Sequence, residues 1–392
     1  MPFFRGLLTR KKLFSSASAE RRKKEHDCYL QNGSCVLEEL LALCDGNCRI
    51  PIHYYTAIEI DNAIRHSNSK MDVAGMSMVT GLLDNRTVLV RFNKRSSSNI
   101  HRDIAITAQM SHLKNVLRLV GCCLEFEQPV MVYEYVEGIS LFDLLFKKGN
   151  PYDQTRKSLL SWGNRLRVAR DVASAIVFLH TEFTTPIIHK FINPSIVIID
   201  EKSSVAKIVD FSNSISLPPG ELKVVADHVS GRIGYLDPEY LQQCIITQKT
   251  DVYSFGILLF QLLTGKDMNS ISRRADFTNS KERIDFEEDA KSNTEEGSAM
   301  NRLDSIILEE TIDFKNLPIN FVDRYIKEDN VMDIADPIIL EEHGIEIQQQ
   351  LEDYLDLVKK CTADKGDDRP YMIHVARELI RIEKCFRALS LG

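Results

Sequence analysis

A change in character near Gly138 constrains the fold of this chain more than any other feature. Before it, apolar and β-branched residues alternate over residues 77–92 and 129–135, which predicts two strands around a turn and then another strand. After it, apolar residues recur at helical spacing in long stretches, at residues 163–181, 250–265 and 348–363. Strands followed by helices predict an α+β protein with two lobes, a small β-rich N-lobe and a large helical C-lobe.

Charge and hydropathy argue against several classes of function. The formal net charge of −7 over 392 residues argues against a general nucleic-acid-binding protein, because such proteins are usually basic. No run of 18 apolar residues would span a membrane, and no apolar segment typical of a secretory signal follows the first basic residues. We therefore expect a cytoplasmic globular protein.

The nine cysteines do not resemble the disulfide framework of a secreted protein. Their number is odd and they are scattered along the chain, which indicates free thiols in a reducing compartment. Four of them fall close together, at Cys28, Cys35, Cys44 and Cys48. Their spacing lacks the two close ligand pairs of common zinc sites, so we expect no metal, and a zinc site is the weaker alternative.

The N-terminal residues 1–54 divide into a basic tail and an amphipathic segment. Residues 1–25 are basic and serine-rich, and we expect a disordered tail because runs of charge are usually only solvated. Peripheral contact with an anionic membrane, at about 1 kcal/mol per basic residue, and an organelle transit peptide are the alternatives.

Residues 33–45 carry apolar side chains at helical spacing, between start and stop signals at Ser34 and Gly46. The apolar stripe, which needs a surface to cover, contains Val36, Leu37, Leu40 and Leu41. It either packs on the body of the protein or enters a groove of a partner.

Four segments occur in an order and spacing that resemble the eukaryotic protein-kinase fold over about residues 55–385. They are IIHKFINPSIVIID at 187–200, KIVDFS at 207–212, GYLDPEY at 234–240 and TDVYSFGILLFQLLTGK at 250–266. The wording of GCCLE at 121–125 and DDRP at 367–370 resembles plant receptor-like kinases of the wall-associated type. Several ordered segments are more specific than any single motif.

The resemblance implies a kinase-like N-lobe over residues 55–136 and a kinase-like C-lobe over residues 137–392. The polar residues 266–300, which contain few aliphatic side chains, predict a mobile insertion in the second lobe. The scaffold of the family is retained in this sequence. Glu239 and Arg369 would form a buried ion pair, and Asp251 would hold the backbone of the catalytic loop; Phe211 and His189 match the family at its metal-binding and catalytic-loop motifs.

The catalytic loop departs from the family pattern His-Arg-Asp…Lys…Asn at the positions that carry the chemistry. Phe191 stands where the family has the aspartate that accepts the proton of the substrate. Asn193 replaces the lysine that neutralises the transferred phosphate, and Ile196 replaces the asparagine that binds the second magnesium ion. Losing one general base costs about 10²–10⁴ in rate, so we expect no catalytic residues here.

The nucleotide site is also degenerate. The three glycines of the phosphate-binding loop fall at Met71, Val73 and Met76, although a shift of one residue would place Gly75 in the loop. The resemblance assigns a relic of the site to three residues, which are Arg91 at the position of the strand lysine, Asp103 as its acidic partner and Asp210 as the metal-binding aspartate. We expect no cofactor, with weak binding of ATP and magnesium as the alternative.

The whole sequence resembles plant receptor-like cytoplasmic pseudokinases that bind a coiled-coil NLR immune receptor. The shared segments include Ile50-Pro51-Ile52 and RPYMIHVARELIRIE at 369–383. By that resemblance, the chain would bind the leucine-rich repeats of the receptor, and also pathogen effectors or active kinases that effectors have modified. Ser212, Ser214, Ser216 and Ser230 are candidate sites for modification by other enzymes.

Two other functions stay open at this point. The first is an atypical serine/threonine kinase with a displaced carboxylate, although no acidic residue occurs between His189 and Ile199. The second is a switch that binds ATP without hydrolysing it, for which Arg91 and Asp210 are the remaining candidates.

Overall fold

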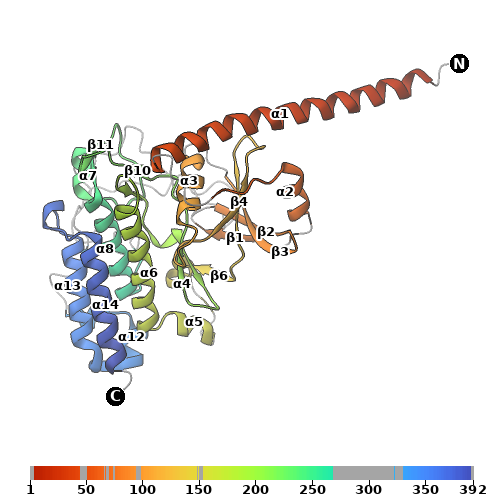
Figure 1. Cartoon of the computed structure of the whole chain (residues 1–392). Coiled ribbons are helices and arrows are strands. Elements are labelled where there is room, and N and C mark those ends of the chain that lie inside the picture. Colours follow the sequence, from red (N-terminus) through yellow and green to blue (C-terminus); the bar gives the residue numbers. More distant parts are fainter. Residues whose placement is uncertain are drawn as a thin grey trace, which may run out of the picture. The chain divides into compact units, whose positions relative to one another are not determined.

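The computed structural model describes most of the chain. It covers residues 4–44, 51–65, 67, 70–73, 76–93, 99–147, 149, 153–267, 322 and 330–389. The chain divides into two compact units (Figure 1). The first comprises Met1–Asp72, Met76–His112 and Leu117–Val136, and the second comprises Val73–Gly75, Leu113–Val116 and Glu137–Gly392.

The first unit is built on a five-stranded sheet in the order β1-β2-β3-β5-β4. Its strands are β1 (Lys70–Val73), β2 (Met76–Leu83), β3 (Arg86–Phe92), β4 (Leu119–Cys123) and β5 (Val130–Glu134). Neighbours from β2 to β4 pair antiparallel. The alternating side chains Val88, Val90, Val130 and Val132 form a core with Ile60 of helix α2 (Ala57–Ile64), which begins with a capping box between Thr56 and Glu59.

Helix α1 (Phe4–Cys44) corrects the prediction for the N-terminus. We expected a disordered tail and a helix from residue 33, but the helix begins near the start of the chain and passes through Gly33 and Ser34. Packing within the first unit accounts for the continuation of the helix through residues 33 and 34. The side-chain nitrogen Nδ2 of Asn32 donates to the carbonyl oxygens of Leu124 and Phe126, both at 2.9 Å. Val36 is 1% exposed. Tertiary contacts therefore extend the helix past the start signal at Ser34.

Two basic residues of the predicted tail belong to this packing. Arg21 lies 3.3 Å from Asp61, and Lys24 lies 2.5 Å from Glu127. Helix α1 also contacts α3 (Ile100–Met110), where Glu39 pairs with Arg102 at 2.8 Å. Two residues of the basic run thus form ion pairs with their own unit, and both pairs are exposed at the surface.

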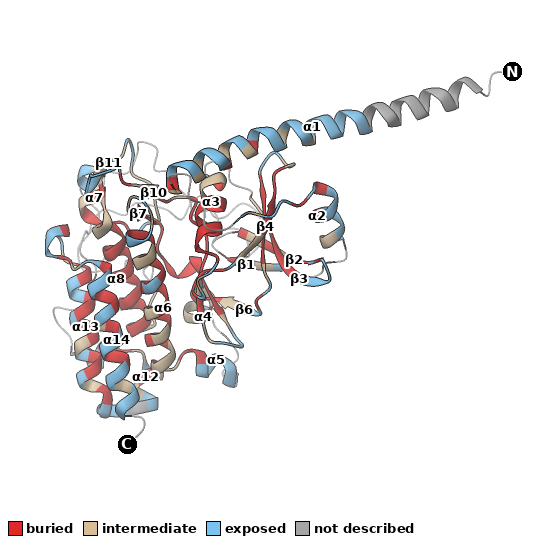
Figure 2. Ribbon diagram, viewed as in Figure 1, coloured by how far each residue is buried: buried red, intermediate tan, exposed pale blue. Residues whose placement is uncertain are grey.

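The second unit is mainly helical, and four long helices form its core. These are α6 (Trp162–Thr181), α8 (Gln248–Thr264), α13 (Gln348–Cys361) and α14 (Met372–Leu389). Helix α8 is almost completely buried (Figure 2). A Cβ at Gly256 would lie 2.7 Å from the Cβ of Cys361, so glycine permits the close approach of α8 to the end of α13.

Short elements complete the second unit. Strands β6 (Gly138–Ser140), β8 (Val197–Asp200) and β9 (Ala206–Ile208) form one sheet. Strand β7 (Ile187–Ile188) pairs with β10 (Ile215–Ser216), and β11 (Lys223–Val225) pairs with β12 (Ile245–Thr247). The short helices are α4 (Leu141–Phe146), α5 (Gln154–Leu159), α7 (Pro238–Gln243), α11 (Val331–Ile334) and α12 (Pro337–His343), and the 3₁₀ turns are η1 (Pro194–Ile196), η4 (Gly344–Ile347) and η5 (Gly366–Asp368).

The structure confirms the predicted fold class, with a β-rich first part and a helical second part. The three long predicted helices are present as α6, α8 and α13, with ends within two residues of the predicted ones. The predicted insertion at 266–300 lies outside the described residues from position 268 onwards. Within the part of the chain that the structure describes, no helix is long and apolar enough to cross a membrane.

Candidate functional site

The segment from His189 to Ile196, which the sequence identified as the catalytic loop, is held by one buried carboxylate. Asp251 lies in the first turn of α8, where the helix dipole favours a negative charge. Its carboxylate accepts hydrogen bonds from the backbone nitrogens of His189 at 2.8 Å and Lys190 at 2.9 Å, and His180 Nε2 lies 2.9 Å away. Lys190 has a φ of 65°, a left-handed conformation that these bonds hold in place.

Phe191 occupies the position of the catalytic base and is 8% exposed. Its backbone nitrogen donates to His189 Nδ1 at 3.3 Å. The ring of His189 in turn lies 5.3 Å from that of Phe211, which is fully buried. A phenyl ring has no atom that accepts a proton, so the position has no acid–base chemistry.

Asn193 serves the structure of the loop. Its amide nitrogen donates to the carbonyl oxygen of Phe191 at 2.8 Å, and its Oδ1 accepts from the backbone nitrogen of Ser195 at 2.9 Å. It thereby caps the turn η1, which ends at the fully buried Ile196. Ile196 offers no oxygen to a metal ion.

Arg232 also contacts this loop, although the sequence analysis did not select it. Its guanidinium donates to Asn193 Oδ1 at 3.1 Å and to the hydroxyl of Ser195. It lies over the ring of Phe142 at 5.3 Å and that of Tyr235 at 5.8 Å. No local pattern marks this arginine, because its hydrogen-bond acceptors lie 37 and 39 positions earlier in the chain.

Asp210 is buried and has a φ of 70°. Its Oδ1 accepts a hydrogen bond from the Ser212 hydroxyl at 2.6 Å. The family has glycine at position 212, so the serine adds a donor that engages the carboxylate expected to bind metal. The bond fixes the orientation of the carboxylate and offsets part of the negative charge on Oδ1.

In the first unit, the structure brings Arg91 and Asp103 together. Arg91 Nη1 lies 2.5 Å from Asp103 Oδ2, and the two side chains are 2% and 0% exposed. The Tyr133 hydroxyl lies 3.3 Å from the same guanidinium nitrogen, and Thr107 donates to Asp103 Oδ1 at 3.0 Å. The pair is thus built into a polar network of the first unit.

The residues at the three predicted glycine positions of the phosphate-binding loop lie in strands β1 and β2. Met71 lies in β1, and Val73 and Met76 are buried at the end of β1 and the start of β2. Gly75, the alternative position, lies outside the described residues. Side chains at these three positions do not provide the open backbone with which a glycine-rich loop approaches phosphates.

The ion pair predicted between Glu239 and Arg369 is wrong, because Arg369 pairs with Asp237. Its Nη2 lies 2.8 Å from Asp237 Oδ1, and the guanidinium also donates to the carbonyl oxygens of Ala363 and Asp364. Asp237 is buried as the N-cap of α7, while Glu239 lies in the first turn of that helix beside Gly366. The buried carboxylate is the one that Arg369 reaches.

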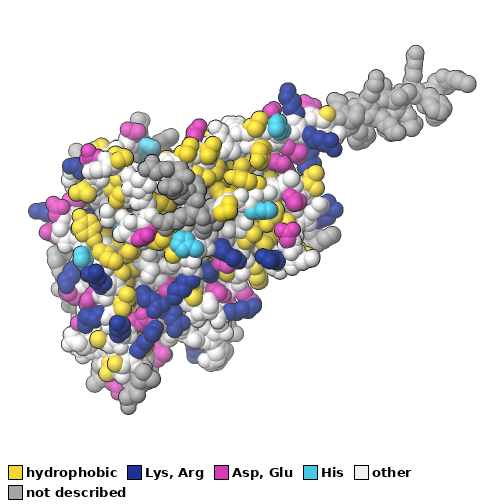
Figure 3. All heavy atoms as spheres, viewed as in Figure 1, with side chains coloured by type: hydrophobic (Ala, Val, Ile, Leu, Met, Phe, Trp, Pro, Cys, Tyr) yellow, Lys and Arg dark blue, Asp and Glu magenta, His cyan; other side chains and the backbone are white. Residues whose placement is uncertain are grey.

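The four residues of the predicted apolar stripe of α1 differ in burial. Val36 is buried, Leu40 is half-buried, and Leu37 and Leu41 are 56% and 53% exposed. Leu30, at 57%, is exposed as well. Figure 3 shows hydrophobic side chains at the surface along the described part of α1.

Of the four candidate serines, Ser212 and Ser214 are buried, whereas Ser216 and Ser230 are half-buried. Ser230 accepts a hydrogen bond from Lys190 Nζ at 3.3 Å.

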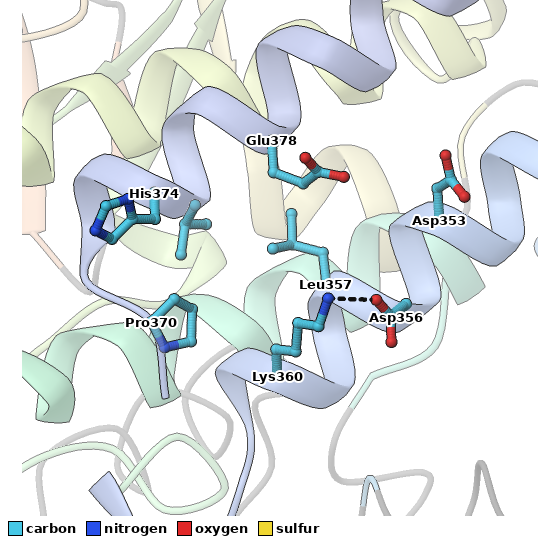
Figure 4. Close-up of a pocket in the computed structure, with 8 residues that line it drawn as sticks. Asp353, Asp356, Leu357, Lys360, Pro370, His374 and Glu378 are labelled. Carbon is cyan, nitrogen blue, oxygen red and sulfur yellow. Dashed lines mark ion pairs between the residues drawn. The ribbon is translucent and has the colours of Figure 1, made fainter. Parts of the chain in front are cut away.

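A groove in the second unit lies between α13 and α14 (Figure 4). Three acidic residues line it, Asp353, Asp356 and Glu378, together with His374 and with Lys360, which pairs with Asp356 at 2.6 Å. No residue of the catalytic loop is among those that line it. Among the described residues, no group of three or more His, Cys, Asp or Glu side chains is placed to hold a metal ion.

The two-unit architecture and the loop held by Asp251 define a protein-kinase fold whose loop lacks the usual catalytic groups. Comparison with known proteins agrees, because the family model "Protein kinase domain" matches residues 86–379. Its relatives include three proteins of Arabidopsis thaliana. Serine/threonine-protein kinase ZRK1 is 31% identical over 97% of this chain and 100% of its own length, and non-functional pseudokinase ZRK2 is 30% identical over 96% and 97%. Wall-associated receptor kinase-like 1 is 30% identical over 97% of this chain but 46% of its own length.

The chain therefore belongs to the protein kinase family, in the group formed by the ZRK proteins and the wall-associated receptor kinase-like proteins. This confirms the resemblance to plant pseudokinases of the wall-associated type. The group includes proteins named as kinases and proteins named as non-functional.

Proposed function

We propose that this protein is a catalytically inactive binding partner, an adaptor or decoy in plant innate immune signalling. Phe191 carries the proposal, because a buried hydrocarbon ring stands where phosphoryl transfer needs a proton acceptor. The retained scaffold supports a folded binding surface, since Asp251 and Arg369 each hold several backbone groups. The name of ZRK2 as a non-functional pseudokinase supports the same proposal.

The partners follow from the resemblance to NLR-associated pseudokinases. We propose that the chain binds the leucine-rich repeats of a coiled-coil NLR receptor, active receptor-like cytoplasmic kinases and pathogen effectors, and binds no nucleic acid. Cytoplasmic localisation is proposed on the same basis. Peripheral membrane contact through the basic N-terminus rests on fewer residues than the sequence suggested, because Arg21 and Lys24 pair with Asp61 and Glu127.

A phosphotransfer assay tests the absence of activity. The purified chain is incubated with labelled ATP, a generic substrate, and magnesium or manganese, beside Asp210→Ala. A second variant carries Phe191→Asp, Asn193→Lys and Ile196→Asn together. We expect no transfer above background from the unmodified chain. A signal that disappears in Asp210→Ala would overturn the proposal and identify an atypical kinase.

The alternative function is a weakly active serine/threonine kinase that binds ATP. Two observations favour it, the buried ion pair between Arg91 and Asp103 and the retention of Asp210. The name of ZRK1 as a serine/threonine-protein kinase also favours it. Against it, neither the ion pair nor Asp210 stands at the position of the catalytic base, and Ser212 donates a hydrogen bond to the Asp210 carboxylate.

A further inference from the structure

Arg232 places a positive charge on the loop that has lost its lysine. Position 193 holds the lysine in the resembled family, and Asn193 has no charge. The guanidinium of Arg232 reaches Asn193 Oδ1 at 3.1 Å and also binds the hydroxyl of Ser195. A cation from the segment between Phe211 and Asp237 thus lies against the degenerate loop.

The two acceptors of Arg232 are inside the protein. Asn193 is fully buried and Ser195 is 8% exposed. A buried acceptor that loses its donor pays the full cost of desolvation, so these oxygens need a resident partner. Asn193 Oδ1 already accepts from the backbone nitrogen of Ser195, and Arg232 supplies the second hydrogen bond to that oxygen.

Arg232 is fixed by neighbours that belong to different elements. Its guanidinium lies over Phe142, in the short helix α4, and over Tyr235, which precedes α7. Tyr235 is 4% exposed, and its hydroxyl donates to Gln261 Oε1 of α8 at 2.8 Å. One of the two rings under Arg232 is therefore fixed to α8 by a hydrogen bond. An arginine that is only solvated has no such fixed aromatic neighbour.

The groups that would hold a magnesium nucleotide at this loop are altered or replaced. Ser212 donates to Asp210 Oδ1, Arg232 and Ser195 donate to Asn193 Oδ1, and Ile196 has no oxygen to offer. These residues do not fit the metal and phosphate binding that the kinase fold implies.

We infer that Arg232 is the resident cation of this loop, and that it keeps the loop and the segment between Phe211 and Asp237 in one arrangement without nucleotide or metal. In the resembled family the positive charge belongs to a lysine of the loop, whereas here it belongs to Arg232, in the segment between Phe211 and Asp237. The two segments are then ordered before a partner binds, so binding does not include the cost of ordering them. Arg232 is thus a positioning residue for whichever partner the chain binds.

Hydrogen exchange of backbone amides tests this role in the full-length chain. We compare Arg232→Ala and Arg232→Lys with Lys223→Ala, a matched control, because Lys223 is an exposed cation of the same segment. We expect Arg232→Ala to raise exchange about tenfold at residues 190–196 and 228–236, the factor that one charge-assisted hydrogen bond supports. Arg232→Lys should lose part of this protection, since an ammonium lacks the planar fork, and Lys223→Ala should lose none.

Chemical rescue separates a cation from a merely space-filling side chain. Dilute guanidinium added to Arg232→Ala should restore protection at both segments, whereas the same concentration of neutral urea should not. Circular dichroism checks that the variant is folded, and Arg232→Lys carries the test where it is not. Unchanged exchange in Arg232→Ala, absence of rescue, or equal rescue by urea would overturn the inference. Added protection of the unmodified chain by ATP and magnesium at residues 190–196 would overturn it as well.

Discussion

Asp251 joins three groups through one buried carboxylate, the backbone nitrogens of His189 and Lys190 and the ring of His180. The residue is 0% exposed, so each of these groups depends on it for a partner that water does not replace. The same interactions would position a catalytic loop in an active enzyme. Their presence beside Phe191 shows that these bonds hold the backbone of the loop independently of a catalytic base.

We predict that Asp251→Asn lowers the free energy of unfolding by about 3 kcal/mol, because an amide cannot accept from both backbone nitrogens with the strength of a carboxylate. Chemical denaturation followed by circular dichroism measures the change. Asp356→Asn is the matched control, since Asp356 pairs with Lys360 on the exposed surface of α13 and its loss should cost about 0.5 kcal/mol or less. A cost for Asp251→Asn as small as that of the control would contradict the role assigned to Asp251.

The contacts of two arginines, Arg369 and Arg232, could not be predicted from the sequence. The resemblance selected the loop residues from His189 to Ile196 as a group, because they are close together in the sequence. It assigned the wrong acid to Arg369, because Asp237 and Glu239 are two positions apart and only their burial decides between them. Arg232 was missed, because its contacts to Asn193 and Ser195 are distant in sequence.

Helix α1 has one side that packs against its own unit and another side that is exposed. Asn32, Val36 and Leu43 are at most 5% exposed, whereas Leu37 and Leu41 are more than half exposed. The sequence predicted an apolar stripe, but periodicity alone does not tell which members face the protein. The distinction matters for the proposed function, since only the exposed leucines are available to a partner groove.

We predict that Leu37→Glu combined with Leu41→Glu leaves the free energy of unfolding within about 0.5 kcal/mol of the original, as is usual for surface changes, but weakens binding to the receptor. Val36→Ala should instead lower stability by about 2 kcal/mol through lost packing. The measurements are chemical denaturation and co-purification with a co-expressed coiled-coil NLR receptor. Leu82→Glu, at a strand residue that is 60% exposed, is the matched control for binding. Unchanged co-purification of the double variant would exclude this side of α1 from the interface.

For the whole molecule, the order of kinase-like segments was sufficient to predict a β-rich part followed by a helical part, because each segment belongs to one element of a known architecture. The long helices α6, α8 and α13 were predictable from periodicity. The two- and three-residue strands β7, β10 and β11 were not, since such short elements exist only through pairing with distant residues. Degeneracy of the loop was predictable from residue types alone, whereas the engagement of Asp210 by Ser212 required coordinates.

The altered nucleotide site predicts how the thermal stability of the folded chain responds to ATP. A ligand that binds only the folded state at 100 times its Kd adds about 2.7 kcal/mol of stability, which raises Tm by several degrees. Because Ile196 offers no side-chain oxygen to magnesium and Asn193 brings no charge to the phosphates, we expect no rise of Tm that depends on the concentration of ATP with magnesium. Differential scanning fluorimetry over a series of ATP concentrations, with ATP and excess chelator as the control, measures this. A saturable rise that needs magnesium and is lost in Asp210→Ala would show that the chain binds nucleotide. Such a result would support a nucleotide-dependent switch even if the chain transfers no phosphate.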